Sequence, residues 1–586
     1  MTQKEMTRRE FLKNAGIVAG AAAGGSLLLS SCATTGAAAS TLPETWDYEA
    51  DIVVIGMGGA GACAAIEAYD AGAKVLVLEK QAEDHHFPNT RMSGGVWHNP
   101  VRDGDPAALK EYIKSMMSGE NLPWKFEGEM EDRSEAMATM FASGILEIQD
   151  FLLKQAPGLD PAAMTPGGDA SFPMFPAFGA GKYGRTVSTR FKDYQNADQD
   201  QRTYQRPTDQ TSNGEAFFRA LVYEGIKSKR PGIQRFYETP AKDLIRDPVD
   251  GRVKGVVATT KDGREIKVKA ARAVVLTSGG FEYSVKMRRA FLEGPGVKGW
   301  GFYGSPDNTG DGIEMAIKIG AALVKVAKSA SRIEPAFPVG VGYEKTGLKM
   351  GTSQNITSNR NSIVVDNYGS RYTDEYIITD STRPYRYQFY KEAVHYDMLT
   401  MCYPRVPSWV IFDETARARG PVVSGGTVQY DFVKWDNDNM NGINAGWIHK
   451  GNTIEELVEK IKADPENREL IDVNNVRTAI QQFNEYCAKG VDEQFGRAIS
   501  TMAPVEKPPY YAMKLYPGGP NTKGGIDADE NRQVYDWEGR PIAGLFSAGE
   551  ISSVFKFVYQ AGGNITECVV CGRKAGQNAA AQRPWA

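Results

Sequence analysis

Cysteine and histidine are scarce: the 586 residues include 6 Cys and 5 His. Six cysteines are too few for a disulfide scaffold of this size. No HExxH motif and no second CxxC motif occurs, so we expect neither a metal site nor a built-in haem or iron–sulfur electron carrier. The single CxxC, Cys568 and Cys571, is interpreted as two small core residues of one helix.

A basic excess is also absent, because 68 Lys and Arg residues face 72 Asp and Glu residues. Nucleic acid is therefore not an expected partner. Glycine, in contrast, is abundant, with 62 residues against a usual share of about 7%. The 24 Phe and 26 Tyr residues are enough to build large cores, which excludes a disordered chain.

The N-terminal residues have the pattern of a targeting signal. Thr7-Arg8-Arg9-Glu10-Phe11-Leu12-Lys13 precedes an apolar stretch over 15–29, which is too short for a membrane span. The pattern resembles a twin-arginine export signal, and Leu29-Ser30-Ser31-Cys32 resembles a lipobox. Residues 1–40 are thus expected to be signal and tether, read by the twin-arginine export machinery. The protein is expected in the periplasm or on the extracytoplasmic face, with a lipid on Cys32 as its membrane contact; cleavage after Ala39 is the alternative.

The first chemical motif follows directly. Residues 50–55 form a buried-strand pattern that leads into Gly56-Met57-Gly58-Gly59-Ala60-Gly61, a helix to residue 71 and a strand at 74–78 that ends at Glu79. This is the βαβ fingerprint of dinucleotide binding. Gly56 permits the tight turn, Gly58 lets the backbone approach a pyrophosphate, and Gly61 lets helix and strand pack closely. Glu79 would accept hydrogen bonds from a ribose.

Further motifs recur in a fixed order. They are Asn89-Thr90-Arg91-Met92-Ser93-Gly94-Gly95, Thr277-Ser278-Gly279-Gly280, Asn308-Thr309-Gly310-Asp311-Gly312, Ala548-Gly549-Glu550 and Gly562-Gly563-Asn564-Ile565. This set resembles the flavoprotein family of soluble fumarate reductases, succinate dehydrogenase flavoprotein subunits, urocanate reductases and 3-ketosteroid Δ1-dehydrogenases, over about residues 48–583.

The resemblance implies an FAD cofactor. The expected FAD-binding positions are Gly56, Gly58, Gly59, Ala60, Gly61, Glu79, Lys80, Asn89, Thr90, Ser93, Gly94, Gly95, Ala241, Thr277, Gly279, Asp311, Thr522, Glu550, Asn564 and Ile565. Relatives that bond FAD covalently carry a His where this chain has Pro88-Asn89, so non-covalent FAD is expected, although His85 and His86 lie close by.

The family fold implies an α/β architecture, in which a Rossmann-like FAD-binding domain is interrupted by an α+β cap domain. We place the FAD-binding domain at about 48–335 and 520–586, and the cap at 336–519. Within the cap, helices are expected over 453–462 and 473–489 and a strand within 404–413. Residues 160–212 are expected to form a long loop.

The carboxylate-binding residues of fumarate reductases are mostly missing. Their positions hold Gln354, Asn355, Ser358, Thr379, Asn521 and Gln560. Each charge-assisted hydrogen bond lost to a buried carboxylate costs about 1.5–3 kcal/mol. A small dicarboxylate is therefore not the expected substrate.

A ketone-binding pair resembles the ketosteroid enzymes instead. Tyr559 and Gly563 have the spacing at which that family polarises a ketone oxygen through a Tyr hydroxyl and a Gly N–H. A Tyr packed at a domain seam is the alternative. Arg383, Tyr376 and Tyr385 are the candidate proton donors, and an aromatic-rich stretch over 385–403 suits an apolar or aromatic ligand or a cap core.

We therefore expect an exported, FAD-dependent reductase of a carbon–carbon double bond conjugated to a carbonyl. Hydride would come from flavin N5 and the proton from an Arg or Tyr. The partners would be a small-molecule substrate and an external electron donor, either a membrane cytochrome or an FMN protein. The alternatives are a ketosteroid-like dehydrogenase running in reverse, a fumarate reductase-like respiratory reductase of another unsaturated acid, and a non-catalytic electron-transfer flavolipoprotein.

Overall fold

The computed structural model describes residues 42–101, 104–118, 133–165, 185–186, 189–192, 213–329, 331–352, 356–376, 385–423, 435–555 and 562–585. The expected signal, lipobox and tether, including Cys32, lie outside the described residues, as do Arg383, Tyr559 and most of the expected loop over 160–212.

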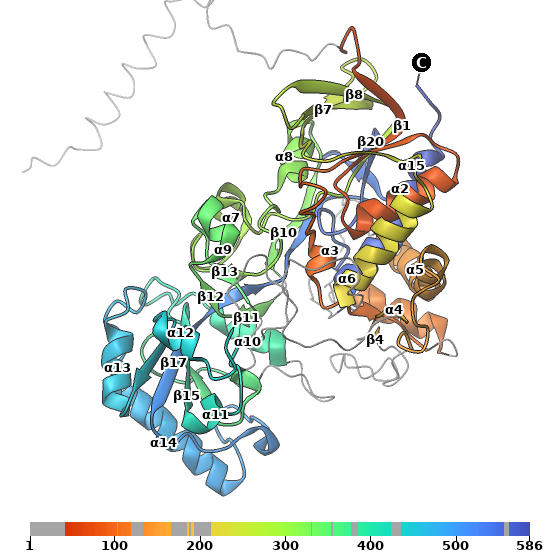
Figure 1. Cartoon of the computed structure of the whole chain (residues 1–586). Coiled ribbons are helices and arrows are strands. Elements are labelled where there is room, and N and C mark those ends of the chain that lie inside the picture. The colour runs from red at the N-terminus through yellow and green to blue at the C-terminus, as the bar shows by residue number, and fades with distance from the viewer. Residues whose placement is uncertain are drawn as a thin grey trace, which may run out of the picture.

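The first lobe is built on a mostly parallel sheet (Figure 1). Its strands run in the order β19 (Gln533–Tyr535), β20 (Pro541–Ser547), β8 (Glu265–Leu276), β1 (Tyr48–Ile55), β2 (Val75–Leu78) and β5 (Gln234–Phe236), with β6 (Ala241–Arg246) and β7 (Val253–Thr259) joined to β8. Val54 pairs with both Val77 and Val275, and Val275 pairs with Phe546. The central strands are almost fully buried, which explains their continuous apolar sequences.

Helices from the two ends of the chain pack together on this sheet. α2 (Gly59–Asp70) lies against α15 (Gly563–Ala580), and a Cβ at Gly576 would collide with the Ala64 carbonyl oxygen. Among the described residues, one helix, α5 (Ser134–Gln155), has the length and composition to cross a membrane. Its buried residues, including Phe141, belong to the same core as α2 and α15.

The second lobe carries an antiparallel sheet, seen below and to the left of the first in Figure 1. Its order is β11 (Arg332–Glu334), β17 (Tyr510–Gly519), β15 (Ser408–Asp413) and β14 (Ser362–Val365), and both β16 (Ile448–Gly451) and β9 (Gly301–Phe302) pair with β17. α13 (Ile454–Lys462) and α14 (Val473–Lys489) cover one face, where Leu457 and Phe483 belong to the same core as Trp409 of β15. Both helices expected here form within one residue of their predicted bounds, and the expected strand, β15, lies within the predicted segment 404–413.

The two lobes are joined by strands that are distant in sequence. β18 (Thr522–Ile526) pairs with β10 (Leu323–Ser329), next to the pairing of β17 with β11. Because β9 and β11 precede residue 336, the predicted domain boundary falls inside the second sheet.

The remaining elements are short or connect the lobes. They are α3 (Asn89–Met92), β3 (Trp97–His98), α4 (Pro106–Ser118), β4 (Arg185–Thr186), α6 (Asn213–Phe218), η3 (Arg219–Ser228), α7 (Val285–Phe291), α8 (Asp311–Lys318), β12 (Ala336–Phe337), α9 (Gly340–Thr346), β13 (Met350–Gly351), η4 (Ile356–Ser358), α10 (Tyr385–Ala393), α11 (Glu414–Ala418), α12 (Met440–Asn444) and η5 (Ile499–Thr501).

Candidate functional site

Two adjoining cavities lie where the first sheet meets α2 and α15. The space in the first is about 820 Å³ and in the second about 940 Å³, with the open solvent at their mouths included. They share four wall residues, namely Asn89, Thr90, Glu550 and Cys568. A long ligand can therefore run from one cavity into the other.

The first cavity opens at the carboxyl ends of β1 and β8, above the N-terminus of α2. Gly56 has a φ of +92°, a backbone conformation that favours glycine. A Cβ at Gly61 would collide with the Gly56 carbonyl oxygen, whereas a Cβ at Gly58 would meet only Pro88, at 3.5 Å. The turn therefore packs tightly on its inner side, and the N-terminal residues of α2 line the cavity, as a pyrophosphate site requires.

The Glu79 carboxylate is part of the wall of this cavity. It accepts hydrogen bonds from the backbone N–H of Met57 at 2.8 Å and of Gln81 at 2.9 Å, and it lies 3.3 Å from His86 Nε2. Burial by itself raises the pKa of Glu79, but His86 and the two N–H groups outweigh it and lower the pKa to about 2. Each carboxylate oxygen retains lone pairs for ribose hydroxyls.

The structure gathers most of the predicted cofactor residues at these two cavities. The first is lined by Gly56, Gly58, Gly59, Ala60, Glu79, Lys80, Asn89, Thr90, Ala241, Thr277, Gly279, Asp311 and Glu550. The second is lined by Asn89, Thr90, Ser93, Gly94, Gly95, Glu550, Asn564 and Ile565. Gly61 and Thr522 lie behind these walls, where Thr522 donates to Glu550. Gly563, the first residue of α15, is not a wall residue of either cavity.

The second cavity lies at the N-terminus of α15. Gly562 has a φ of +101° and turns the chain into the helix, so that Asn564 and Ile565 face the cavity. Asn564 Nδ2 donates to Asn521 Oδ1 at 2.8 Å, and Lys523 Nζ donates to Asn564 Oδ1 at 2.5 Å. A helix N-terminus with this amide favours a group that gains negative charge.

Several residues that line the second cavity were not predicted from the sequence. Arg332, Tyr303, Met92 and Val96 line it, and Arg332 is the one cationic side chain among its described wall residues. Arg332 Nη1 lies 3.5 Å from Glu334 Oε1. No local motif marks Arg332, because long-range pairing of β11 with β17 brings it there. Cys568, which was interpreted as a core residue, also lines both cavities, whereas Cys571 is buried.

The predicted proton donors are not gathered at the described walls. Tyr376 lines neither cavity; its ring lies 5.7 Å from the Arg497 guanidinium carbon. Tyr385 begins α10, but its side chain lies outside the described part of the chain, together with Arg383 and Tyr559. Their catalytic roles stay predictions.

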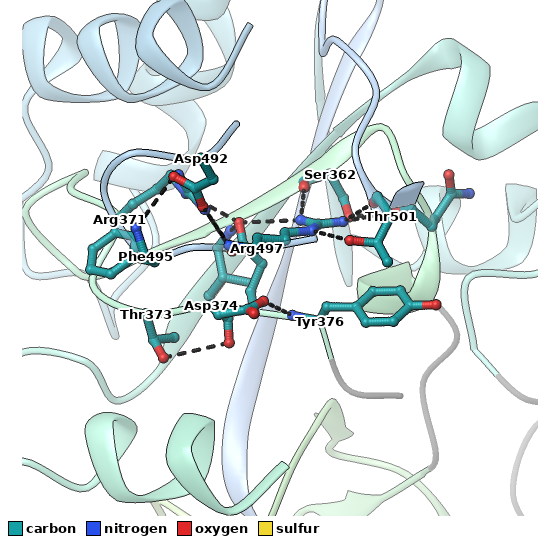
Figure 2. Close-up of polar contacts among 12 residues, drawn as sticks. Ser362, Arg371, Thr373, Asp374, Tyr376, Asp492, Phe495, Arg497 and Thr501 are labelled. Atoms are coloured by element: carbon teal, nitrogen blue, oxygen red, sulfur yellow. Dashed lines mark hydrogen bonds and ion pairs between the residues drawn. The ribbon is translucent and has the colours of Figure 1, made fainter. Parts of the chain in front are cut away.

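A buried ionic cluster organises the segment beside Tyr376 (Figure 2). Arg371 donates to Glu375 at 2.9 Å and to Asp492 at 3.0 Å. Arg497 donates to the backbone carbonyls of Ser362 at 2.9 Å and Thr501 at 2.7 Å. The cluster thus ties β14 to the segment after α14, and it holds the chain that leads toward the predicted proton donors.

The Asp374 carboxyl group, in the same region, has an unfavourable environment for its ionised form. One carboxyl oxygen accepts the Tyr376 N–H at 3.0 Å, and the other is buried without a hydrogen-bond partner among the described residues. Burial, with the neighbouring Glu375 charge, raises the pKa of Asp374 to about 6. The ionised form is therefore disfavoured in the folded protein, so its cost is absent below about pH 4 and complete above about pH 6.

We expect Asp374→Asn to raise the free energy of unfolding by about 1–2 kcal/mol at pH 7.5 and to leave it unchanged near pH 4. Urea unfolding at the two pH values measures this difference. A gain of equal size at both values would show that the carboxyl charge is not the cause.

Known proteins share the sequence pattern of this chain. The family model described as "FAD binding domain" matches residues 51–566. A 3-oxosteroid 1-dehydrogenase of Mycolicibacterium smegmatis is 28% identical, over 86% of this chain and 92% of the relative. A digoxin reductase of Eggerthella lenta is 26% identical, over 100% of this chain and 98% of the relative.

A solved structure shares the fold. The 3-ketosteroid Δ1-dehydrogenase of Sterolibacterium denitrificans, in complex with 1,4-androstadiene-3,17-dione, has a TM-score of 0.67 at 22% identity. The match covers 91% of this chain and 99% of that one. The expected family resemblance is confirmed, and so is a mixed helix-and-sheet flavoprotein fold.

Proposed function

We propose that this chain, which belongs to the FAD binding domain family and is an FAD-dependent oxidoreductase, reduces a carbon–carbon double bond conjugated to a carbonyl. The substrate class would be apolar or aromatic rather than a small dicarboxylate. The names of the two relatives above, a steroid dehydrogenase and a digoxin reductase, support chemistry at such bonds in large, weakly charged molecules.

The composition of the second cavity carries the proposal. Its described walls include Met92, Val96, Tyr303 and Ile565, with Arg332 as the one cation. A dicarboxylate bound away from water needs several charge-assisted partners. One cation, the acidic Glu550 and otherwise uncharged walls fit a single carbonyl or carboxylate on a larger apolar body better than a dicarboxylate.

The residues that line the two cavities fit FAD. The Glu79 carboxylate would hold the ribose, the N-terminus of α2 the pyrophosphate, and the N-terminus of α15 with Asn564 the pyrimidine edge of the flavin. FAD supplies the hydride when bound. Asn89 donates its amide to two carboxyls and accepts from Ser305 N–H at 2.6 Å, which leaves no nucleophile there for attachment. We propose non-covalent FAD.

The remaining roles follow the family pattern. The Tyr559 hydroxyl and the Gly563 N–H would polarise the substrate carbonyl and stabilise developing enolate charge. Arg383, Tyr376 or Tyr385 would deliver the proton to the other carbon. The second lobe, which includes most of the predicted cap at 336–519, would act as a cap on a Rossmann-like FAD-binding domain. Export by the twin-arginine route, with a lipid on Cys32, would place the enzyme beside a membrane cytochrome or FMN-protein electron donor.

A substrate panel tests this function. Purified holoprotein, reduced anaerobically with a viologen dye, should be reoxidised by enones or enoates of a steroid-like or aromatic kind and not by fumarate. The same panel run in the oxidising direction, with a dye as acceptor, tests a ketosteroid-like dehydrogenase. Failure of every enone, enoate and steroid in both directions would leave an electron-transfer flavoprotein.

We expect Tyr559→Phe to lower kcat by about 10²–10³-fold, because it removes one of the two donors to the carbonyl oxygen. The FAD content should stay the same. Tyr343→Phe, at an exposed position on α9 that lines neither cavity, is the matched control. An unchanged kcat in the Tyr559 variant would remove this hydroxyl from catalysis.

A further inference from the structure

Two carboxyl groups meet on the wall that the cavities share. Glu550 follows β20 and lines both cavities, whereas Glu282 follows the Gly279-Gly280 turn after β8 and is fully buried. Asn89 Nδ2 donates to Glu282 Oε1 and to Glu550 Oε2, each at 2.9 Å. One amide therefore holds both acids, and only Glu550 faces the cofactor space.

The other two carboxyl oxygens crowd a single point. A Cβ built on Gly280 would lie 2.6 Å from Glu282 Oε2 and closer still to Glu550 Oε1. Glu550 Oε1 accepts from the Thr522 N–H at 3.1 Å and from the Thr522 hydroxyl at 3.2 Å. Glu282 Oε2 is buried and has no hydrogen-bond partner among the described residues. A proton on one carboxyl would supply the missing bond between these oxygens.

The surroundings do not neutralise two negative charges. Neither Glu282 nor Glu550 forms an ion pair within the described ranges. Their other neighbours are Asn308, which donates to Glu282 at 3.1 Å, the Cys568 thiol on α15, and Tyr283 and Arg288. Arg288 donates to the backbone carbonyl of Glu282, not to its carboxyl group. Burial raises the pKa of both acids, and the charge of Glu282 raises that of Glu550 further.

We propose that Glu282 and Glu550 share one proton, and that Glu282 is a positioning residue that keeps this wall singly charged toward bound FAD. FAD must pass Glu550 to occupy both cavities, and its pyrophosphate is anionic. A doubly ionised pair would repel it, so bound FAD holds the shared proton more tightly than the empty cavity does. By linkage, FAD binds with its full affinity at pH values below the pKa that the pair has in the free protein. It then falls as pH rises, by up to tenfold per pH unit for one proton.

Glu282→Gln is the matched variant. Its amide oxygen can still accept from Asn89 and Asn308, and its Nε2 can donate permanently to Glu550 Oε1. The Kd for FAD is measured from about pH 6 to about pH 9. Holoprotein is diluted into buffer that contains free FAD, and ultrafiltration separates the bound from the free cofactor. We expect the Kd of the unmodified protein to rise across this range and that of Glu282→Gln to stay flat. Glu49→Gln, an exposed position on β1, should follow the unmodified protein.

A second measurement does not depend on the variant or on any substrate. The infrared spectrum of the unmodified holoprotein at neutral pH should contain the carbonyl band of a protonated carboxylic acid that exchanges slowly in deuterium oxide. The band should be lost in Glu282→Gln. Absence of the band in the unmodified protein, or equal pH slopes of the Kd in the two proteins, would overturn the shared proton. Neither result bears on which double bond the enzyme reduces.

Discussion

Glu79→Gln is expected to weaken FAD binding about ten- to hundredfold. The change removes a carboxylate that can accept charge-assisted hydrogen bonds from the ribose, each worth about 1.5–3 kcal/mol, and tenfold in Kd corresponds to about 1.4 kcal/mol. It also brings an amide –NH₂ toward the N–H of Met57 or Gln81, where only an acceptor fits.

The pH behaviour of Glu79 separates its effect from that of the Glu282–Glu550 pair. The folded-state pKa of Glu79 is depressed to about 2, so its contribution is complete above about pH 4.5 and is lost only as pH falls toward 2. Between pH 6 and 9 it should be constant. The Kd of Glu79→Gln should therefore be raised by the same factor throughout this range, while the slope from the carboxyl pair remains.

Ultrafiltration with free FAD measures this Kd, and Glu49→Gln serves again as the exposed control, on the neighbouring strand β1. A Glu79→Gln protein that retains FAD as tightly as the unmodified protein would show that the ribose is held elsewhere. A loss of secondary structure in the variant, followed by circular dichroism, would instead assign Glu79 to folding of the βαβ turn.

Arg371→Leu is expected to destabilise the second lobe by about 3–5 kcal/mol. The side chain is 1% exposed and lies between Glu375 and Asp492, whose side chains are both 0% exposed. Its removal leaves Asp492 without the guanidinium partner and Glu375 with Arg497 alone, at 3.4 Å. Uncompensated buried charge is among the largest single-residue penalties in folding.

The control for Arg371 is Arg477→Leu, which breaks an exposed ion pair with Glu455 and should cost less than about 1 kcal/mol. Urea unfolding followed by far-ultraviolet circular dichroism gives both values, and release of FAD reports on the first lobe separately. Adding Asp492→Asn to Arg371→Leu should recover part of the loss, because it removes one stranded charge. A loss no larger than that of the control would mean that the cluster is solvated or rearranges freely.

Local sequence predicted the parts of the fold that local physics decides. The expected strand at 50–55 is β1 at Tyr48–Ile55, and the expected helix at 473–489 is α14 at the same bounds. Glycines, caps and apolar periodicity act within a few residues, so they are readable from the chain. The same holds for Glu79, which is placed by the strand that it ends.

The site residues that the sequence did not reveal are brought together by pairing between strands that are distant in sequence. Arg332 reaches the second cavity because β11 pairs with β17, almost two hundred residues away. Glu282 lies two residues after a recognised glycine pair, yet its partner Glu550 lies just after β20, in the C-terminal part of the sequence. No property of a residue's own neighbours indicates such a meeting.

The order of strands in the first sheet has a consequence for how the protein is made. β1 is completed within the first sixty residues, but its neighbour β8 ends at Leu276, and the strand beyond β8 ends at Ser547. α15, which packs on α2, is the last helix of the described chain. A ribosome-bound chain therefore lacks a complete flavin site until α15 has been synthesised, and the edges of its early strands stay unpaired until their partners are made. Because residues of α15 line both cavities, FAD can occupy the complete site only after that helix has been synthesised.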